Sequence, residues 1–502
     1  MVILILSLLV SFYPAQYITK LYTEFLGRVP DQQGYKGYSD YFQQNGCNDF
    51  TLKVIGYQFL NSEEFAQLNY SGSARIIATF RALLNREPTV AEFEYFKGRD
   101  WKDSLFFIYG TDEFNKDMVK LVCSSKSEYN KARYGWRGVA ASSGYIVIPE
   151  SEFLELVKMT PKGQTLWLPA RSAVFLTKSV DVYGIAIKTA GNPHEYLNMA
   201  RLIRAKNFNG PGGCRQLKST CGESLIRLHD SSTLENVWVD GNGQALEYNV
   251  WDINVQTLGS NVVVRGCRVD NSAGFSNIQA IPVGECRAIC IDNNFILGYN
   301  SDGFANKKSS NPWVDGITSS CEGTLVHSNS IVDTSDVSIV IFAPREGMIQ
   351  SSKVMGNVIH NAGNSSFAAL NTDHIFVTYP ADFSDTFFES NLIWTSDFVS
   401  IRTALSVGSG LWGQNGTGYG YGAQFLNNTT GTGFVQSQFG ILLAGMRAAT
   451  VLGNKLDIKL VDTRCGNLPA NIFAADTETS AFNTNLDQNY RTIPKAPCFN
   501  IM

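Results

Sequence analysis

Charged residues and long apolar runs are both scarce in this chain of 502 residues. Asp, Glu, Lys and Arg make up 17% of it, against about 25% in an average globular protein. The net charge is −4 and there is no basic block, so we expect no nucleic-acid partner, because such binding rests on phosphate neutralisation. No apolar run reaches the roughly 20 residues of a transmembrane helix. The five histidines are scattered without zinc spacing.

The amino-terminal residues and the cysteines indicate export. Met1–Val10 is almost entirely apolar, and we expect residues 1–15 to form a secretory signal peptide; the alternative is a buried first helix. Ten cysteines, an even number, are typical of disulfides in an oxidising compartment. Cys286 and Cys290 lack a zinc-type spacing, and we expect buried thiols or a disulfide there.

Acceptor sequons for N-glycosylation also occur, and they agree with a secreted or cell-surface glycoprotein. They lie at Asn69, Asn364, Asn415, Asn427 and Asn428. Because the chain is rich in asparagine, the sequons support export only weakly.

Residues 17–130 have helical periodicity and fall into two related halves. Residues 26–30 (LGRVP) match 84–88 (LNREP), and residues 62–65 (SEEF) match 111–114 (TDEF). In each half an apolar stripe ends at a Gly or Asn followed by Pro, and a Ser or Thr then caps the next helix.

This repeat resembles a small helical domain of unknown function in bacterial surface and secreted proteins, and it is distantly similar to the phycobilisome linker domain. The resemblance rests on the LGRxPD…NSEEF signature of residues 26–65. It implies attachment or assembly rather than catalysis. We expect Arg28 and Arg86 to be structural, capping carbonyls or pairing with a carboxylate.

From about residue 144 short β-branched runs alternate with Gly, Asn, Asp and Ser turns. An amphipathic helix that includes Phe153 and Leu156 precedes them, and we expect it to cap the open end of a solenoid. One asparagine then recurs about once per 30 residues. It stands at Asn236, Asn294, Asn329, Asn357, Asn391 and Asn454, with Cys267 in the same place. Asparagine tolerates a left-handed bend and can bond its counterpart in the next rung, so we interpret the series as structural.

The repeat resembles the parallel β-helices of the pectin-lyase-like superfamily over residues 144–470, followed by a tail at 471–502. We therefore expect a mainly β fold, a right-handed parallel β-helix solenoid preceded by a small all-α domain. A β-sandwich is the competing fold. The resemblance implies polysaccharide processing or binding on the solenoid flank, and it is specific for fold rather than function.

Ser-Asp pairs recur just after the asparagine turn, ending at Asp302, Asp336 and Asp397. Because rungs lie about 4.8 Å apart, Asp302 and Asp336 are expected within about 5 Å of each other. Stacked carboxylates raise one pKa or bind a cation, which suits a retaining acid–nucleophile pair or a calcium site. The alternative is that each Ser-Asp caps a turn.

Other residues extend this candidate site. Asp315 is a further catalytic carboxylate, while Lys307 and Arg345 are weaker candidates for an electrophile or a lyase base. The Gly-rich stretch 408–422 carries three aromatic residues that would stack on sugar faces. These candidate substrate-binding residues are Trp412, Tyr419 and Tyr421.

Two motif fragments are incomplete. Residues 371–373 (Asn-Thr-Asp) match the first motif of polygalacturonase-type hydrolases, but the motifs that should follow are absent. Residues 237–240 (VWVD) look like the Trp-Ile-Asp-His of pectate lyases, but Gly241 replaces the histidine. We set both aside and expect Trp238 in the core.

Two hypotheses follow. In the first, the chain is a secreted carbohydrate-active β-helix protein that binds or cleaves an extracellular polysaccharide as a lyase or hydrolase, with calcium as the candidate cofactor. In the second, it is a non-catalytic surface, adhesion or assembly protein that uses the β-helix as a rigid binding rod. The partner in both is a polysaccharide or a cell-surface or matrix glycan.

Overall fold

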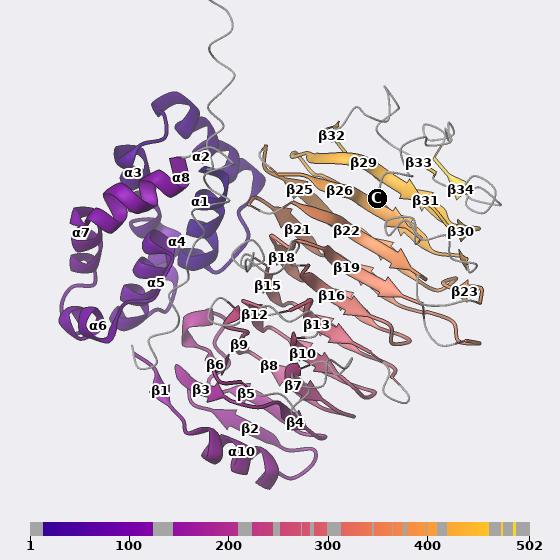
Figure 1. Ribbon diagram of the computed structural model, residues 1–502, viewed down its shortest axis with the longest axis horizontal. Helices are drawn as coiled ribbons and strands as arrows, with labels where there is room; N and C mark the ends of the chain where they lie inside the picture. The colour runs from indigo at the N-terminus through magenta and orange to yellow at the C-terminus, as the bar shows by residue number, and fades with distance from the viewer. Residues whose placement is uncertain are drawn as a thin grey trace, which may run out of the picture. The chain divides into compact units, whose positions relative to one another are not determined.

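The chain has a helical front part and a long strand-rich part (Figure 1). By its contacts it divides into two compact units. The first comprises residues 1–148, 169–173 and 191–200, and the second comprises the rest. The computed structural model describes residues 14–123, 144–208, 223–243, 252–272, 274–281, 286–298, 313–343, 346–363, 365–374, 379–397, 399–408, 419–460, 473–474 and 485–487.

The first unit is built from short helices. They are α1 (Pro14–Leu21), η1 (Tyr22–Leu26), α2 (Gln32–Asn45), α3 (Asp49–Leu60), α4 (Glu63–Gln67), α5 (Gly72–Leu84), α6 (Val90–Phe96), α7 (Lys102–Gly110), η2 (Glu113–Met118), α8 (Val119–Cys123) and η3 (Tyr196–Asn198). In the part of the chain that the structure describes, no helix is long and apolar enough to cross a membrane. The end of the predicted signal peptide, Pro14 and Ala15, is buried at the start of α1; its other residues lie outside the described ranges.

Each of the two predicted halves of the helical repeat contains an equivalent arginine–glutamate contact. Arg28 donates through Nη2 to Glu64 at 2.8 Å. Arg86 donates through Nε and Nη2 to the two carboxylate oxygens of Glu113, both at 2.8 Å. The helices before them end at residues in the left-handed conformation, Gly27 and Asn85. The expected pairing of both arginines with a carboxylate is confirmed.

Among the described residues, the second part of the chain forms three long sheets whose strand pairs are all parallel. Sheet 1 comprises β4 (Val180–Val182), β7 (Glu223–Leu228), β10 (Asp252–Thr257), β13 (Ser276–Ala280), β16 (Asp315–Ser319), β19 (Val337–Phe342), β22 (Ser366–Asp373), β26 (Ile401–Val407), β29 (Val435–Leu443), β32 (Ile458–Leu460) and β33 (Phe473–Ala474). Sheet 2 comprises β2 (Thr165–Leu168), β5 (Ala186–Thr189), β8 (Thr233–Glu235), β11 (Val263–Arg265), β14 (Cys290–Asp292), β17 (Leu325–His327), β20 (Lys353–Met355), β24 (Phe387–Glu389), β28 (Gln424–Leu426), β31 (Thr450–Leu452) and β34 (Asn485–Leu486). Sheet 3 comprises β1 (Ile146–Val147), β3 (Ser172–Leu176), β6 (Ala200–Arg204), β9 (Val237–Asp240), β12 (Arg268–Asp270), β15 (Phe295–Leu297), β18 (Ser330–Val332), β21 (Val358–Asn361) and β25 (Leu392–Thr395).

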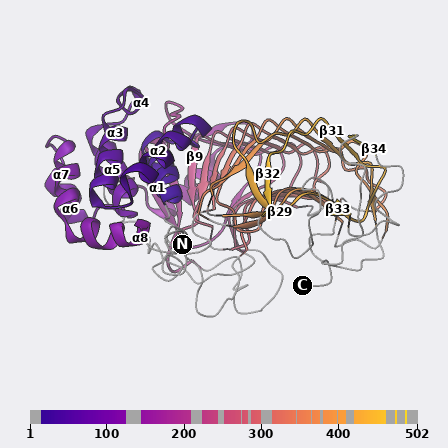
Figure 2. The same cartoon turned by 90° about the horizontal axis from the view of Figure 1, so that it is seen from above.

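Each rung runs through sheet 1, then sheet 2, then sheet 3, and Figure 2 shows the rungs stacked one behind another. A side chain from the middle of the sheet 2 strands β5 to β31 points inward and is fully buried, which closes the core. These residues include Val264, Ile291, Val326, Val354 and Phe388. The fold is a right-handed parallel β-helix, as predicted. Parallel pairing throughout the described strands excludes the β-sandwich, whose sheets are antiparallel.

The recurrent asparagine forms a continuous ladder at the turn between sheets 2 and 3. The side-chain oxygen of each accepts the backbone N–H of the residue one rung earlier, at 2.9–3.1 Å. The ladder runs through Asn294, Asn329, Asn357, Asn391, Asn428 and Asn454. Its structural role is confirmed, and Asn428 fills the double step that the sequence spacing left open.

Two details of the ladder prediction are wrong. Glu235 pairs with Arg265, so Val237 rather than Asn236 aligns with Cys267. The left-handed conformation belongs to the residue before the ladder position, as in Asn236 (φ 51°) and Gly266 (φ 59°). In each turn one residue therefore adopts the positive φ of the bend, and the next residue supplies the buried amide of the ladder.

The start of the solenoid agrees with the prediction of a capping helix. Helix α10 (Glu150–Met159) lies beside β2 at the end of the stack in Figure 1. Phe153 is its fully buried residue, whereas Leu156 is 38% exposed. A small sheet of β23 (Ala381–Asp382), β27 (Gly420–Tyr421) and β30 (Met446–Arg447) lies beyond the carboxyl ends of the later sheet 1 strands (Figure 1).

The described cysteines form two disulfides, Cys47–Cys123 and Cys286–Cys321. Of the buried thiols or disulfide expected at Cys286 and Cys290, Cys286 forms a disulfide with Cys321, whereas Cys290 is a free thiol that is partly exposed rather than buried. The sequon at Asn428 is also inaccessible in the folded chain, because its side chain is fully buried in the ladder.

Candidate functional site

Asp315 begins β16 and is 3% exposed. Its Oδ2 accepts the hydroxyl of Thr318 at 2.7 Å, and its Oδ1 accepts the backbone N–H of Val337 in the next rung at 3.0 Å. Burial raises the pKa of Asp315 to about 7, although these two hydrogen bonds favour the ionised form. Near neutral pH this carboxyl therefore exists both with and without its proton.

Asp336 directly precedes β19 and is 5% exposed. Within the described residues, its buried Oδ1 has no hydrogen-bond partner. Burial raises the pKa of Asp336 well above its usual range, and the charges of Asp315 and Asp373 raise it further. Because the charge of Asp315 raises the pKa of Asp336, the protonation of one carboxyl depends on that of the other.

Two aromatic rings flank the rung that carries Asp336. Trp313 and Phe367 stack with their ring centres 4.3 Å apart. The backbone N–H of Phe367 donates to the carbonyl of Asp336 at 2.8 Å, which places the phenylalanine one rung further on. The guanidinium of Arg402 lies 5.9 Å from the Phe367 ring centre. All three side chains are partly exposed, so they offer a stacking surface and a positive charge beside the acid.

Asp373 ends β22 and belongs to the Asn-Thr-Asp fragment of residues 371–373. It is fully buried, and the amide of Asn371 donates to its Oδ2 at 3.4 Å. Its charge raises the pKa of Asp336, so Asp373 acts electrostatically on the pair. Asp373 is in register with Phe342 at the carboxyl edge of sheet 1, so it influences the pair by its charge and is not a third carboxyl of the site; residues 371–373 were the signal in the sequence for it.

Part of the predicted site falls outside the described residues, namely Asp302, Lys307, Arg345 and Trp412. The expected contact of Asp302 with Asp336 lies outside them as well. Asp397 is exposed and pairs with Lys459 at 3.3 Å, so it is not a member of the buried acidic group. The hydroxyl of Ser335 accepts the Val314 N–H at 3.0 Å, which is a bond between rungs rather than the local turn cap of the alternative.

Tyr419 and Tyr421 do not join the carboxyls. Tyr421 donates its hydroxyl to Asp382 at 2.8 Å, and the Tyr419 ring lies 3.7 Å from the guanidinium of Arg447. Both tyrosines follow the carboxyl end of β26, whereas Asp315 begins β16. In a parallel sheet these positions are at opposite edges, so the two tyrosines lie away from the two carboxyls.

Of the two predicted calcium ligands, Asp302 and Asp336, the structure describes Asp336. Both oxygens of Asp315 already accept hydrogen bonds, which leaves Oδ1 of Asp336 without a partner. Calcium takes about six to eight oxygen ligands. The second predicted calcium ligand, Asp302, lies outside the described part of the chain.

Trp238 is fully buried, as expected, but its surroundings are charged. Its indole N–H donates to Asp270 at 2.8 Å, and the guanidinium of Arg201 lies 3.7 Å from its ring centre. Arg201 in turn pairs with buried Asp240. The pectate-lyase-like fragment therefore contributes to a closed ion network rather than to an accessible site.

No family model and no curated protein sequence matches the chain. Among solved structures, it is similar to a PL6 alginate lyase in complex with a trisaccharide (11% identity, TM-score 0.35), over 66% of this chain and 64% of the lyase chain. It is also similar to the catalytic unit of a GH87 α-1,3-glucanase from Streptomyces thermodiastaticus (12% identity, TM-score 0.36), over 71% of each chain. A family 28 exopolygalacturonase from Yersinia enterocolitica matches at 10% identity and TM-score 0.30, over 70% of this chain and 80% of its own. These similarities concern the fold.

Proposed function

We propose that the chain is a carbohydrate-active protein that hydrolyses a polysaccharide at the amino-terminal edge of sheet 1. The observation that carries the proposal is the pKa of about 7 of buried Asp315, electrostatically coupled to Asp336 with its unpartnered oxygen. Glycoside hydrolysis needs one protonated carboxyl to donate to the leaving oxygen and one ionised carboxyl to act as nucleophile or base.

The environment of the two carboxyls supports a division of roles. Asp315 accepts hydrogen bonds at both of its oxygens, from Thr318 and Val337, which favour the ionised form and suit the nucleophile or base. Burial and the charges of Asp315 and Asp373 raise the pKa of Asp336 well above its usual range, so this carboxyl keeps its proton and suits the proton donor.

The aromatic pair supplies the binding surface in this proposal. Trp313 and Phe367 present partly exposed rings beside the acid, and sugar rings stack on such faces. Arg402 adds a positive charge at the same place, so we favour a polysaccharide that carries carboxylate or sulfate groups.

We also propose that the protein is secreted or displayed at the cell surface. Two disulfides among the described cysteines are typical of an oxidising compartment. Residues 1–15 would serve as the signal peptide, 17–130 as an attachment domain, 144–470 as the polysaccharide-processing solenoid and 471–502 as a tail.

The test is mass spectrometry of products formed from a panel of acidic and neutral polysaccharides. We expect fully hydrated oligosaccharides from the natural chain, and a loss of at least about a hundredfold in rate for Asp315→Asn and for Asp336→Asn. Asp397→Asn is the matched control, because Asp397 shares the Ser-Asp motif but is exposed. Unsaturated products, lighter by one water, would identify a lyase instead.

The low exposure of both carboxyls, 3% and 5%, favours a second candidate function. In it the β-helix is a non-catalytic rod that binds a surface or matrix glycan. Saturable binding of a polysaccharide without any product, unchanged in Asp315→Asn, would favour the rod over the hydrolase.

A further inference from the structure

A cysteine, an aspartate and a histidine meet on the outer face of sheet 2. Cys290 and Asp292 lie on β14, and His327 lies in register with Asp292 on β17. The intervening Ile291 and Val326 point inward and are fully buried, so the three polar side chains face outward. Their ligating atoms lie within 4.8 Å of one another, and all three residues are partly exposed.

We propose that Cys290, Asp292 and His327 bind a zinc-type divalent metal ion. A thiolate, an imidazole and a carboxylate are the donors that zinc prefers in proteins, and three protein ligands leave a fourth position for water. The Nε2 atom of His327 is already 3.2 Å from Oδ1 of Asp292. That separation is close to the edge of a tetrahedron with metal–ligand bonds of about 2.0–2.3 Å, so modest rotation of Cys290 completes the site.

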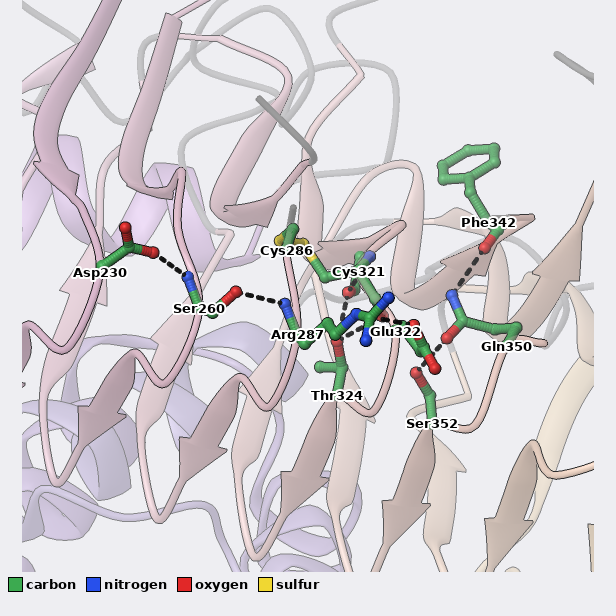
Figure 3. Close-up of a disulfide and its surroundings, with 11 residues drawn as sticks. Asp230, Ser260, Cys286, Arg287, Cys321, Glu322, Thr324, Phe342, Gln350 and Ser352 are labelled. Carbon is green, nitrogen blue, oxygen red and sulfur yellow. Dashed lines mark hydrogen bonds and ion pairs between the residues drawn. A yellow bond between two sulfur atoms is a disulfide. The ribbon is translucent and has the colours of Figure 1, made fainter. Parts of the chain in front are cut away.

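The framework around these ligands is unusually constrained. The disulfide Cys286–Cys321 joins the two rungs just before β14 and β17 (Figure 3). Beside it, Arg287 pairs with Glu322 at 3.1 Å across the same two rungs. Because the rungs cannot slide against each other, the register that places His327 beside Asp292 is fixed before any ion binds.

The free thiol is a second reason to expect a ligand. The chain forms disulfides, yet Cys290 remains unpaired and partly exposed. An exposed free thiol in a disulfide-forming compartment is open to oxidation and exchange. Binding to a metal ion would hold the thiolate in place and protect it.

Arg265 would compete with a bound metal ion. Arg265 is in register with Asp292 on β11, donates to its Oδ2 at 2.8 Å and also bonds the sulfur of Cys290. Its side chain is 46% exposed, so it can swing into solvent. Arg265 and the metal ion are therefore alternative cations for the same two acidic groups, and the arginine lowers the metal affinity.

The test titrates the full chain, stripped of metal with a chelator, with Zn²⁺ by calorimetry and with Co²⁺ by absorption. We expect one ion per chain and a thiolate-to-cobalt charge-transfer band. Cys290→Ser should abolish the band, and Cys290→Ser and His327→Ala should each weaken Zn²⁺ binding at least about tenfold. Arg265→Gln should strengthen binding about two- to fivefold, since an exposed ion pair is lost as a competitor.

The matched control is His229→Ala. His229 is also partly exposed and also lies 2.8 Å from an aspartate, Asp181, but it belongs to no group of metal ligands in the described residues. Its variant should bind Zn²⁺ as the natural chain does. Unchanged Zn²⁺ affinity in Cys290→Ser, or weaker binding in Arg265→Gln, would overturn the proposal. Circular dichroism of each variant shows that any loss is not a loss of folding.

Discussion

The side-chain oxygen of Asn357 accepts two hydrogen bonds from Asn329, one from its backbone N–H at 2.9 Å and one from its side-chain amide at 3.0 Å. Asn357 in turn donates its own amide to the carbonyl of Val326 and to Asn391. Each ladder asparagine thus satisfies a buried backbone N–H that no apolar side chain could satisfy.

Replacing Asn357 with alanine should therefore destabilise the solenoid by about 1–3 kcal/mol, because the Asn329 N–H loses its partner inside the protein. Urea unfolding of the full chain measures this. Asn427→Gly is the control: Asn427 occupies the left-handed position before a ladder residue (φ 55°), which glycine adopts freely. A decrease of less than about 0.5 kcal/mol in the free energy of unfolding of Asn357→Ala would contradict the stabilising role of the ladder hydrogen bonds.

The two repeat arginines of the helical unit should differ in importance. The side chain of Arg86 is 10% exposed and binds Glu113 and Glu92, whereas Arg28 is 38% exposed and binds Glu64 and Asp31. We expect Arg86→Ala to cost about 2–4 kcal/mol, because two partly buried carboxylates lose their partner. Arg28→Ala should cost less than about 1 kcal/mol. Thermal unfolding followed by helical circular dichroism compares them, and equal costs would contradict the argument from burial.

Asp315 should make the solenoid less stable as the pH rises. Its pKa is raised to about 7 by burial, so the folded chain holds a proton that the unfolded chain releases near pH 4. The raised pKa contributes on the order of 2–4 kcal/mol to the free energy of unfolding. This contribution is fully present below about pH 4 and is lost as the pH rises through about 7. Asparagine mimics the protonated acid, so Asp315→Asn should remove the loss.

Comparing Asp315→Asn with the natural chain by urea unfolding at pH 4.5 and 7.5 isolates this effect. The comparison is needed because buried His360, with its pKa lowered to about 3 by burial, contributes the opposite slope: its stabilisation is lost as the pH falls below about 6.5. We expect the free energy of unfolding of Asp315→Asn, taken relative to that of the natural chain, to be higher at pH 7.5 than at pH 4.5. An equal effect at the two pH values would show that Asp315 stays ionised in the folded chain.

The repeated sequence pattern predicted the fold, but it did not align every rung correctly. The recurrence of asparagine identified the rungs, since a buried turn amide must repeat once per coil. Asn428 escaped because the Gly-rich insertion lengthens its rung, so that the spacing to Asn391 is 37 residues rather than about 30. Asn236 was misplaced by one residue, because two consecutive turn positions both accept asparagine.

Sequence spacing alone does not predict which side chains of the candidate sites lie close together. Asp315 and Asp336 were predicted, but their proximity depends on the residues that join β16 to β19. The group of Cys290, Asp292 and His327 was not predicted at all. His327 is 35 residues from Asp292 in the chain, and only the register of β14 with β17 brings them together.

The aromatic pair gives the last prediction, which rests on the proposed function. If sugar rings stack beside Asp336, Trp313→Ala should weaken oligosaccharide binding about tenfold, because an exposed stacking face is lost. Tyr421→Phe is the control: it removes the bond to Asp382 at the opposite edge of the sheet and should leave binding unchanged. Calorimetry in an Asp315→Asn background prevents turnover. Weaker binding in Tyr421→Phe with unchanged binding in Trp313→Ala would move the substrate to the carboxyl edge of sheet 1, away from the acidic pair.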